Sequence, residues 1–333
     1  MLDGITLRAI GLGGGAVTGE EAQPPQSAAP PRAKIGLALG GGAARGWSHI
    51  GVLRVLEREG LAPDVIAGTS IGAVVGGCFA ADKLDELEEF ARALNKRRVV
   101  GLMDFHLNGS GLLGGDRLRR LLEQHLGTLR IESLPTRLVG IATELGTGHE
   151  IWLTRGPMVE ALRASYALPG IFDAVKFGGR WLMDGALVNP IPVTAARAHG
   201  AEIVVCVNLN GDVRGRGTVI PAHGPDDEEG EEAGQSGAQG GLFGRRMLRF
   251  GRRSDGAPGI GTVMMDAFNI TQDRIARSRL AGDPPDVMIS PKLGRIGLFD
   301  FHRADEIIAL GEEAAEKALG ELRELIAQQT VPA

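Results

Sequence analysis

Gly68-Thr69-Ser70-Ile71-Gly72 places one serine between two glycines, directly after the apolar run 65–67. The pattern Gly-x-Ser-x-Gly is typical of a nucleophile elbow, in which a strand turns sharply into a helix and exposes the serine hydroxyl. Gly68 and Gly72 would support this turn by leaving room for the backbones that cross there. The stretch therefore predicts a strand–turn–helix unit with Ser70 as its nucleophile. Because the chain holds 51 glycines, the neighbouring sequence has to support the motif.

A glycine-rich segment lies one predicted helix and one predicted strand before the elbow. The apolar segment 34–39 has the length of a buried strand and leads directly into Gly40-Gly41-Gly42-Ala43-Ala44-Arg45-Gly46. Residues 47–59 have the spacing of a helix. A glycine-rich turn between a strand and a helix directs backbone N–H groups toward one point, near the positive end of the helix dipole. We therefore expect the amides of residues 40–44 to bind an anion, with Arg45 in a supporting position.

Two kinds of anion suit such a loop, a nucleotide phosphate and the oxyanion of an acyl-transfer intermediate. Gly40 and Gly42 are followed by Arg45 where the dinucleotide-binding pattern requires a third glycine, and no Gly-Lys-Ser/Thr ending indicates a P-loop. The nearby candidate nucleophile favours an oxyanion hole. Loss of one donor from such a site typically costs about 2.7–4 kcal/mol of transition-state stabilisation.

A third candidate residue, Asp184, ends the apolar segment 181–183 and precedes Gly185 and Ala186. By itself, an Asp-Gly pair is more typical of a hairpin turn than of a catalytic site. Together, however, the three motifs resemble those of the patatin-like phospholipase family, and in particular of its bacterial members. The resemblance covers about residues 34–210 and much of 258–325. It also includes His49, Gly51, Ala164-Ser165-Tyr166-Ala167-Leu168-Pro169-Gly170 and Val188-Asn189-Pro190-Ile191-Pro192.

The resemblance implies an α/β fold, with a mainly parallel central sheet between helices in a patatin-like three-layer architecture. It also implies a serine acyl hydrolase that cleaves lipid esters, phospholipid or lysophospholipid, without a metal or cofactor. Ser70 would attack the ester carbonyl, Asp184 would accept the serine proton, and the loop amides would hold the oxyanion. The alternative is a regulatory protein that keeps the fold and binds a lipid or a partner without physiological turnover.

A Ser–Asp dyad makes a chemical demand on the aspartate, because a free aspartate has a pKa near 3.9 and is a poor base. Burial of Asp184 would raise its basicity, and the helix dipole at the elbow would favour the seryl oxygen. A histidine triad is the alternative to the dyad, since Ser70, Asp184 and His302 follow the α/β-hydrolase order. That fold has several strands before its elbow, whereas about 30 residues separate the first predicted strand from Ser70 here. His302 is therefore expected to pack or cap, and His49 to support the glycine loop.

Alternating strand and helix patterns predict the layout of the fold. Strands are expected at 35–39, 65–67, 137–142, 203–208 and 286–290. Helices are expected at 47–59, 71–81, 84–95, 115–126, 157–166, 192–199, 259–280 and 303–327. The uncharged apolar run 65–81 is too short and too rich in glycine for a membrane span, so we expect a buried strand and helix there.

The chain divides into four predicted parts: a flexible tail at 1–33, a catalytic core at 34–210, a low-complexity insertion at 211–258, and the rest of the core at 259–330. The tail lacks the pattern of a signal peptide. Cys78 and Cys206 lie in apolar segments and are expected to be buried free thiols, which fits a reducing, cytoplasmic location. No particular oligomeric state is indicated.

The end of the insertion, residues 242–253, has five arginines on one side of a helical wheel and Phe243, Met247 and Phe250 on another. This pattern is typical of a basic interfacial helix, which would place the protein peripherally at the inner face of the membrane. The alternative is a linker whose arginines pair with the acidic run 226–232. The net charge of −5 gives no general attraction to anionic lipid, and no nucleic-acid partner is expected.

Overall fold

Parallel strands form the centre of the sheet. The computed structural model describes residues 32–95, 116–211 and 259–330, all within the compact unit Arg32–Ala333. The parallel strands lie in the order β3-β2-β1-β7-β8. Their bounds are β1 Ile35–Leu39, β2 Val65–Thr69, β3 Arg137–Glu144, β7 Ile203–Val207 and β8 Val287–Ile289. β1, β2 and β7 are buried along their whole length, as expected for parallel strands covered on both faces.

Three further strands extend the sheet in the antiparallel direction, and the sequence patterns did not predict them. They are β4 Glu150–Leu153, β5 Val175–Phe177 and β6 Arg180–Asp184. β4 and β6 both pair with β3, and β5 pairs with β6. These strands are short and partly exposed, so their sequences lack the continuous apolar runs of the central strands.

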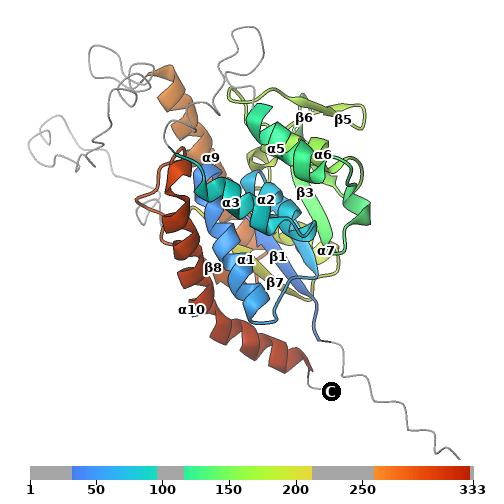
Figure 1. Cartoon of the computed structure of the whole chain (residues 1–333), viewed down its shortest axis with the longest axis vertical. Helices are drawn as coiled ribbons and strands as arrows, with labels where there is room; N and C mark the ends of the chain where they lie inside the picture. Colours follow the sequence, from blue (N-terminus) through green and yellow to red (C-terminus); the bar gives the residue numbers. More distant parts are fainter. Residues whose placement is uncertain (1–31, 96–115, 212–258, 331–333) are drawn as a thin grey trace, which may run out of the picture. The chain divides into compact units, whose positions relative to one another are not determined.

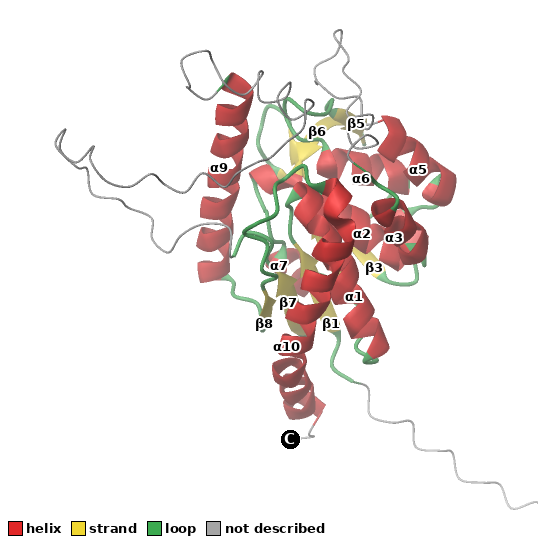
Figure 2. Cartoon of the chain, turned by 60° about the vertical axis from the view of Figure 1, so that its left-hand side comes forward, coloured by secondary structure: helices red, strands yellow, loops and turns green. Residues whose placement is uncertain are grey.

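Helices cover both faces of the sheet and make three layers. One face carries α1 Ser48–Arg58, α2 Ile71–Ala80, α3 Leu84–Arg92, α5 Asp116–Leu126, α6 Met158–Tyr166 and α10 Ala304–Thr330. In Figure 1, α1, α2 and α3 lie in front of the strands, and α10 runs beside α1. The other face packs against α7 Val193–Ala198 and the second half of α9 Ile260–Gly282, and Figure 2 shows α9 on the side away from α1.

The C-terminal part of the chain belongs to the same packing unit as the first strands. α10 crosses α1 at two glycines: a Cβ on Gly51 would lie 2.1 Å from the Ile308 carbonyl oxygen, and one on Gly311 would lie 2.0 Å from that of Ser48. Side chains larger than hydrogen would force these helices apart. β8 then adds to the sheet beside β7.

The α/β fold class is confirmed, and the run 65–81 consists of β2 and α2. Each predicted helix has a counterpart whose ends lie within a few residues. Cys78 and Cys206 are buried and free, and burial raises both thiol pKa values to about 12. Within residues 32–95, 116–211 and 259–330, no helix has the length and apolar character that crossing a membrane requires. Segment 242–253 and nearly all of the predicted tail and insertion lie outside the described residues.

Candidate active site

Ser70 sits at the junction of β2 and α2 with a strained backbone. Its φ and ψ are 57° and −123°, and it is one of three described residues other than glycine with positive φ. Such strain is concentrated at functional sites. The flanking glycines are required here: a Cβ on Gly72 would lie 2.3 Å from the Leu39 carbonyl oxygen, and one on Gly68 would lie 2.6 Å from the Ala73 backbone. The predicted elbow geometry is therefore present.

The register of β3 explains why Asp184 lies beside Ser70. β2 runs parallel to β3 and ends with Thr69 opposite Ile141. β6 runs antiparallel to β3 and ends with Asp184 opposite the next residue, Ala142. The two strands thus approach along β3 from opposite directions, and their last residues occupy adjacent register positions. This arrangement brings together residues that are 114 positions apart in the sequence.

A direct hydrogen bond joins the two candidate residues. The Ser70 hydroxyl donates to Asp184 Oδ2 at 2.7 Å, and the Ala186 N–H donates to Oδ1 at 2.8 Å. Asp184 is 2% exposed. Burial raises its pKa to about 6, although the hydrogen bonds from Ala186 and Ser70 oppose the shift. At neutral pH the carboxylate is therefore ionised and more basic than a carboxylate in water.

Ser165, which the sequence analysis noted only within a family segment, connects three elements at the elbow. It lies on α6 and is fully buried. Its Oγ accepts the Ser70 N–H at 3.0 Å and donates to the Ile141 carbonyl on β3 at 2.6 Å. Ser165 therefore holds the backbone of the strained residue. Its sequence signal was limited to being the single serine of a predicted helix that also carries Glu160 and Arg163.

The glycine loop supplies fewer free amides than the sequence suggested. Three N–H groups donate within the fold, from Gly40 to Val207 O at 3.2 Å, from Gly41 to Pro190 O at 3.1 Å, and from Ala44 to Leu298 O at 3.0 Å. The expectation that all of residues 40–44 serve an oxyanion is therefore too broad. For the amides of Gly42 and Ala43, no acceptor is present among the described residues. Both residues line the cavity that contains Ser70, and Ala43 has a positive φ of 50°.

His49 and Arg45 support the loop from behind. His49 on α1 is fully buried, and its Nε2 hydrogen-bonds to the Gly40 carbonyl at 2.8 Å. Burial lowers its pKa to about 4, so it is neutral at physiological pH and donates this bond. The Arg45 Nε donates to the Ile296 carbonyl at 2.9 Å, which ties the loop to the segment before α10. Both residues therefore hold the loop through hydrogen bonds to backbone carbonyls.

The donors to the Asp184 carboxylate do not include His302, the alternative base that the sequence analysis set aside in favour of a packing or capping role. Ala186 and Ser70 donate to the two carboxylate oxygens of Asp184. His302 lies in the short helix Phe301–Arg303 and is absent from the described residues that line the cavity, whereas Phe299 and Phe301 are among them. The geometry therefore favours the direct Ser–Asp pair.

A cavity of about 140 Å³ opens at Ser70 and Asp184. Its walls come from both ends of the described chain and are largely apolar. The apolar and aromatic lining residues are Trp47, Ile71, Val74, Phe90, Leu94, Leu118, Tyr166, Leu168, Ile171, Phe172, Met265, Phe268, Leu298, Phe299 and Phe301. Such a cavity can shield an acyl chain from water while the ester group of the same molecule lies next to the Ser70 hydroxyl.

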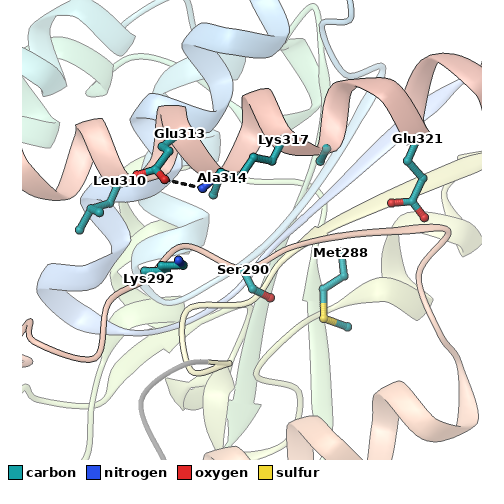
Figure 3. A pocket seen from close by; sticks show the side chains of 9 residues that line it. Met288, Ser290, Lys292, Leu310, Glu313, Ala314, Lys317 and Glu321 are labelled. Carbon is teal, nitrogen blue, oxygen red and sulfur yellow. Dashed lines mark hydrogen bonds and ion pairs between the residues drawn. The ribbon is translucent and has the colours of Figure 1, made fainter.

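A second cavity, of about 280 Å³, lies between β8 and α10 (Figure 3). It is lined by charged residues, including Lys292 and the ion-paired Glu313 and Lys317. Ser290 is present, but among the described residues its hydroxyl is not hydrogen-bonded to Glu313, Glu321 or any other base. The combination of a nucleophile, a base and an apolar cavity is therefore found at Ser70.

The fold and the site together define an α/β protein with a serine–aspartate pair at the carboxyl ends of its parallel strands. The sequence model of Patatin-like phospholipase matches residues 37–197. An NTE family protein of Mycobacterium bovis is 31% identical over 328 residues, which cover 86% of this chain and 91% of that protein. The chain belongs to the patatin-like phospholipase family, whose activity is lipid hydrolysis.

Two further similarities are more distant. Lysophospholipase NTE1 of Yarrowia lipolytica is 28% identical over 295 residues, which cover 87% of this chain but 20% of that protein. Among solved structures, VipD from Legionella pneumophila aligns with a TM-score of 0.42 and 14% identity, over 56% of this chain and 51% of that one.

Proposed function

We propose that the protein is a serine acyl hydrolase that cleaves lipid esters with Ser70 as nucleophile and Asp184 as general base. The observation that carries this proposal is the 2.7 Å hydrogen bond from the Ser70 hydroxyl to the buried carboxylate. As the serine oxygen bonds to the ester carbonyl carbon, its proton passes to Asp184. The alcohol then leaves with that proton, and water hydrolyses the acyl-serine by the same route in reverse.

The oxyanion that forms in each step needs donors that are not already bonded. The N–H groups of Gly42 and Ala43 meet this requirement, because both residues line the cavity and their amides lack an acceptor among the described residues. The dipole of α2, which begins at Ile71, adds positive potential near the serine. We assign the oxyanion hole to these two amides.

The substrate class is a lipid ester with at least one acyl chain. The aromatic and aliphatic walls of the cavity match an acyl chain, and the related Yarrowia lipolytica protein is named a lysophospholipase. On this basis phospholipids and lysophospholipids are the first substrates to assay. The mechanism uses only groups of this chain and water.

Fluorophosphonate labelling tests the nucleophile. The purified protein should acquire a single adduct, which peptide mass spectrometry should locate on Ser70. Ser70→Ala should not be labelled, whereas Ser133→Ala, which removes an exposed hydroxyl, should be labelled like the wild type. A well-folded protein that is not labelled, or is labelled on another serine, would refute the assignment.

Membrane contact through 242–253 is a separate proposal, supported by the five arginines and three large apolar residues of that segment. Deletion of 242–253 should reduce binding to anionic phosphatidylglycerol vesicles and leave the hydrolysis of a water-soluble ester unchanged. Unchanged vesicle binding would eliminate this segment as the contact.

A further inference from the structure

One side-chain amide in the wall of the active-site cavity has no hydrogen-bond partner among the residues that the structure describes. Gln272 lies on α9, is 6% exposed and lines the cavity that contains Ser70. Across the described residues, no group hydrogen-bonds to its side chain. Its amide atoms are not among the fully buried atoms without a partner, so they are accessible from the cavity. Asn269, one helical turn earlier, lines the same cavity and is likewise without a side-chain partner there. A buried polar group that bonds to nothing in the fold requires an explanation.

Three buried hydroxyls near this site have a structural role, because each is hydrogen-bonded within the fold. Thr69, Thr143 and Ser165 each donate to a backbone carbonyl, at distances of 2.8, 2.8 and 2.6 Å. Gln272 makes no such bond, and its neighbours on the same face of α9, Met265 and Phe268, are apolar. A leucine would satisfy packing at this position equally well. The amide is therefore better explained by a ligand than by the fold.

The charges in the cavity indicate what kind of ligand group the amide would accept. Among the described lining residues, Asp184 is the only carboxylate, and lysine, arginine and histidine are absent. A phosphate inside the cavity would face this carboxylate, and none of these described residues supplies a compensating cation, which is unfavourable where water is excluded. An amide presents an N–H donor and a C=O acceptor, and an alcohol hydroxyl needs both.

We infer that Gln272, with Asn269 beside it, binds a free hydroxyl on the glycerol backbone next to the scissile ester. The inference rests on the proposed function, because it places this hydroxyl on the lipid whose ester Ser70 attacks. Monoacylglycerols and lysophospholipids share this group, and a charged headgroup would lie outside the cavity. Loss of a hydrogen bond to a buried polar group would make the enzyme discriminate against esters without the hydroxyl.

The test compares two octanoyl esters that differ at one oxygen. One is 1-octanoylglycerol, and the other is 3-hydroxypropyl octanoate, which lacks the hydroxyl on the central carbon; both are used below the concentration at which they aggregate. The wild type should have a kcat/KM about 10- to 100-fold higher for the glycerol ester. Gln272→Leu should bring the ratio close to one by lowering kcat/KM for the glycerol ester.

Thr271→Leu is the matched control, because it makes the same kind of change at the adjacent, exposed position and should keep the wild-type ratio. Gln272→Leu should also unfold at the same or a higher temperature than the wild type, since no hydrogen bond within the fold is lost. A ratio that Gln272→Leu leaves unchanged, or a wild-type ratio near one, would overturn the inference. A marked loss of stability would also contradict it, since that would assign Gln272 a structural role.

A binding measurement separates this inference from the proposed function. Calorimetry with Ser70→Ala should detect tighter binding of 1-octanoylglycerol than of 3-hydroxypropyl octanoate, and the difference should disappear in Ser70→Ala/Gln272→Leu. If wild type cleaves no ester and Ser70 is not labelled, the hydrolase assignment fails, whereas hydroxyl-dependent binding would still support the subsite. A third substrate, 1-octanoyl lysophosphatidylcholine, distinguishes the two candidate lipid classes. Its cleavage with the same dependence on Gln272 would indicate a lysophospholipid substrate. Cleavage of the monoacylglycerol alone would indicate a neutral lipid substrate.

Discussion

Replacement of Asp184 by asparagine should stabilise the protein at neutral pH while removing most of its activity. The carboxylate is fully buried, and its pKa rises from an ordinary value of 3.8 to about 6 on folding. The folded state therefore binds this proton more tightly than the unfolded state does. The associated stability is fully present below about pH 4 and is lost as the pH rises through about 6.

The magnitude follows from the difference between these two pKa values. At 1.36 kcal/mol for each pKa unit, ionisation of Asp184 costs the fold up to about 3 kcal/mol above pH 7. Asp184→Asn removes the charge but keeps an oxygen that can accept the Ala186 N–H, and an amide that can face Ser70. The variant should therefore exceed the wild type in free energy of unfolding by up to about 3 kcal/mol at pH 8, and by little at pH 4.

Denaturant unfolding of both proteins between pH 4 and pH 8 measures this difference directly. The wild-type curve alone would mislead, because the pKa of buried His49 is lowered to about 4, and protonation of His49 destabilises the fold as the pH falls below 6.5. Subtraction of the two curves cancels the His49 contribution. Asp266→Asn, at an exposed carboxylate on α9, should follow the wild type at every pH.

The activity of the same variant tests the role of Asp184 as a base. Loss of a general base typically costs about 10²- to 10⁴-fold in turnover. The rate of p-nitrophenyl butyrate hydrolysis should therefore decrease by at least about 100-fold. A stability difference that stays constant from pH 4 to pH 8 would show that Asp184 is not a buried, ionising group. Residual turnover above a tenth of the wild-type value would refute the dyad.

The remaining predictions concern the pH profile and two neighbouring residues. For the wild type, kcat/KM should rise with an apparent pKa near 6 as Asp184 becomes the free base, and a profile that is flat from pH 5 to pH 8 would contradict this role. Ser165→Ala should lower the free energy of unfolding by about 1–3 kcal/mol, because it leaves the Ser70 N–H and the Ile141 carbonyl unpaired, and it should slow fluorophosphonate labelling of Ser70. Ser133→Ala removes an exposed hydroxyl that donates to the Arg130 carbonyl, so it should lower the free energy of unfolding by less and leave the labelling rate unchanged. Equal effects of the two variants would remove the assigned role of Ser165. His302→Ala should retain most of the wild-type turnover, and a loss above about 100-fold would revive the histidine triad.

The parts of the candidate site that could be predicted from the sequence are those that depend on a local residue pattern. An elbow needs glycines on both sides of its serine, and the close backbone contacts at Gly68 and Gly72 show why no other residue fits there. The central strands were also recognisable, because parallel strands buried on both faces have continuous apolar sequences. Asp184 was identified only through the resemblance to a family, since an aspartate before a glycine is common in ordinary turns.

Only the tertiary structure decided how these residues meet and which groups remain free. β4, β5 and β6 are partly exposed strands that the sequence patterns did not predict, yet the pairing of β6 along β3 places Asp184 beside Ser70. The amides of Gly40 and Gly41 look equivalent to those of Gly42 and Ala43 in sequence, but carbonyls from distant segments already accept the first two. Gln272 was one polar residue in a predicted helix until folding buried it at the cavity. Local patterns specify the elbow and the central elements, whereas hydrogen-bond partners and burial depend on contacts between distant residues.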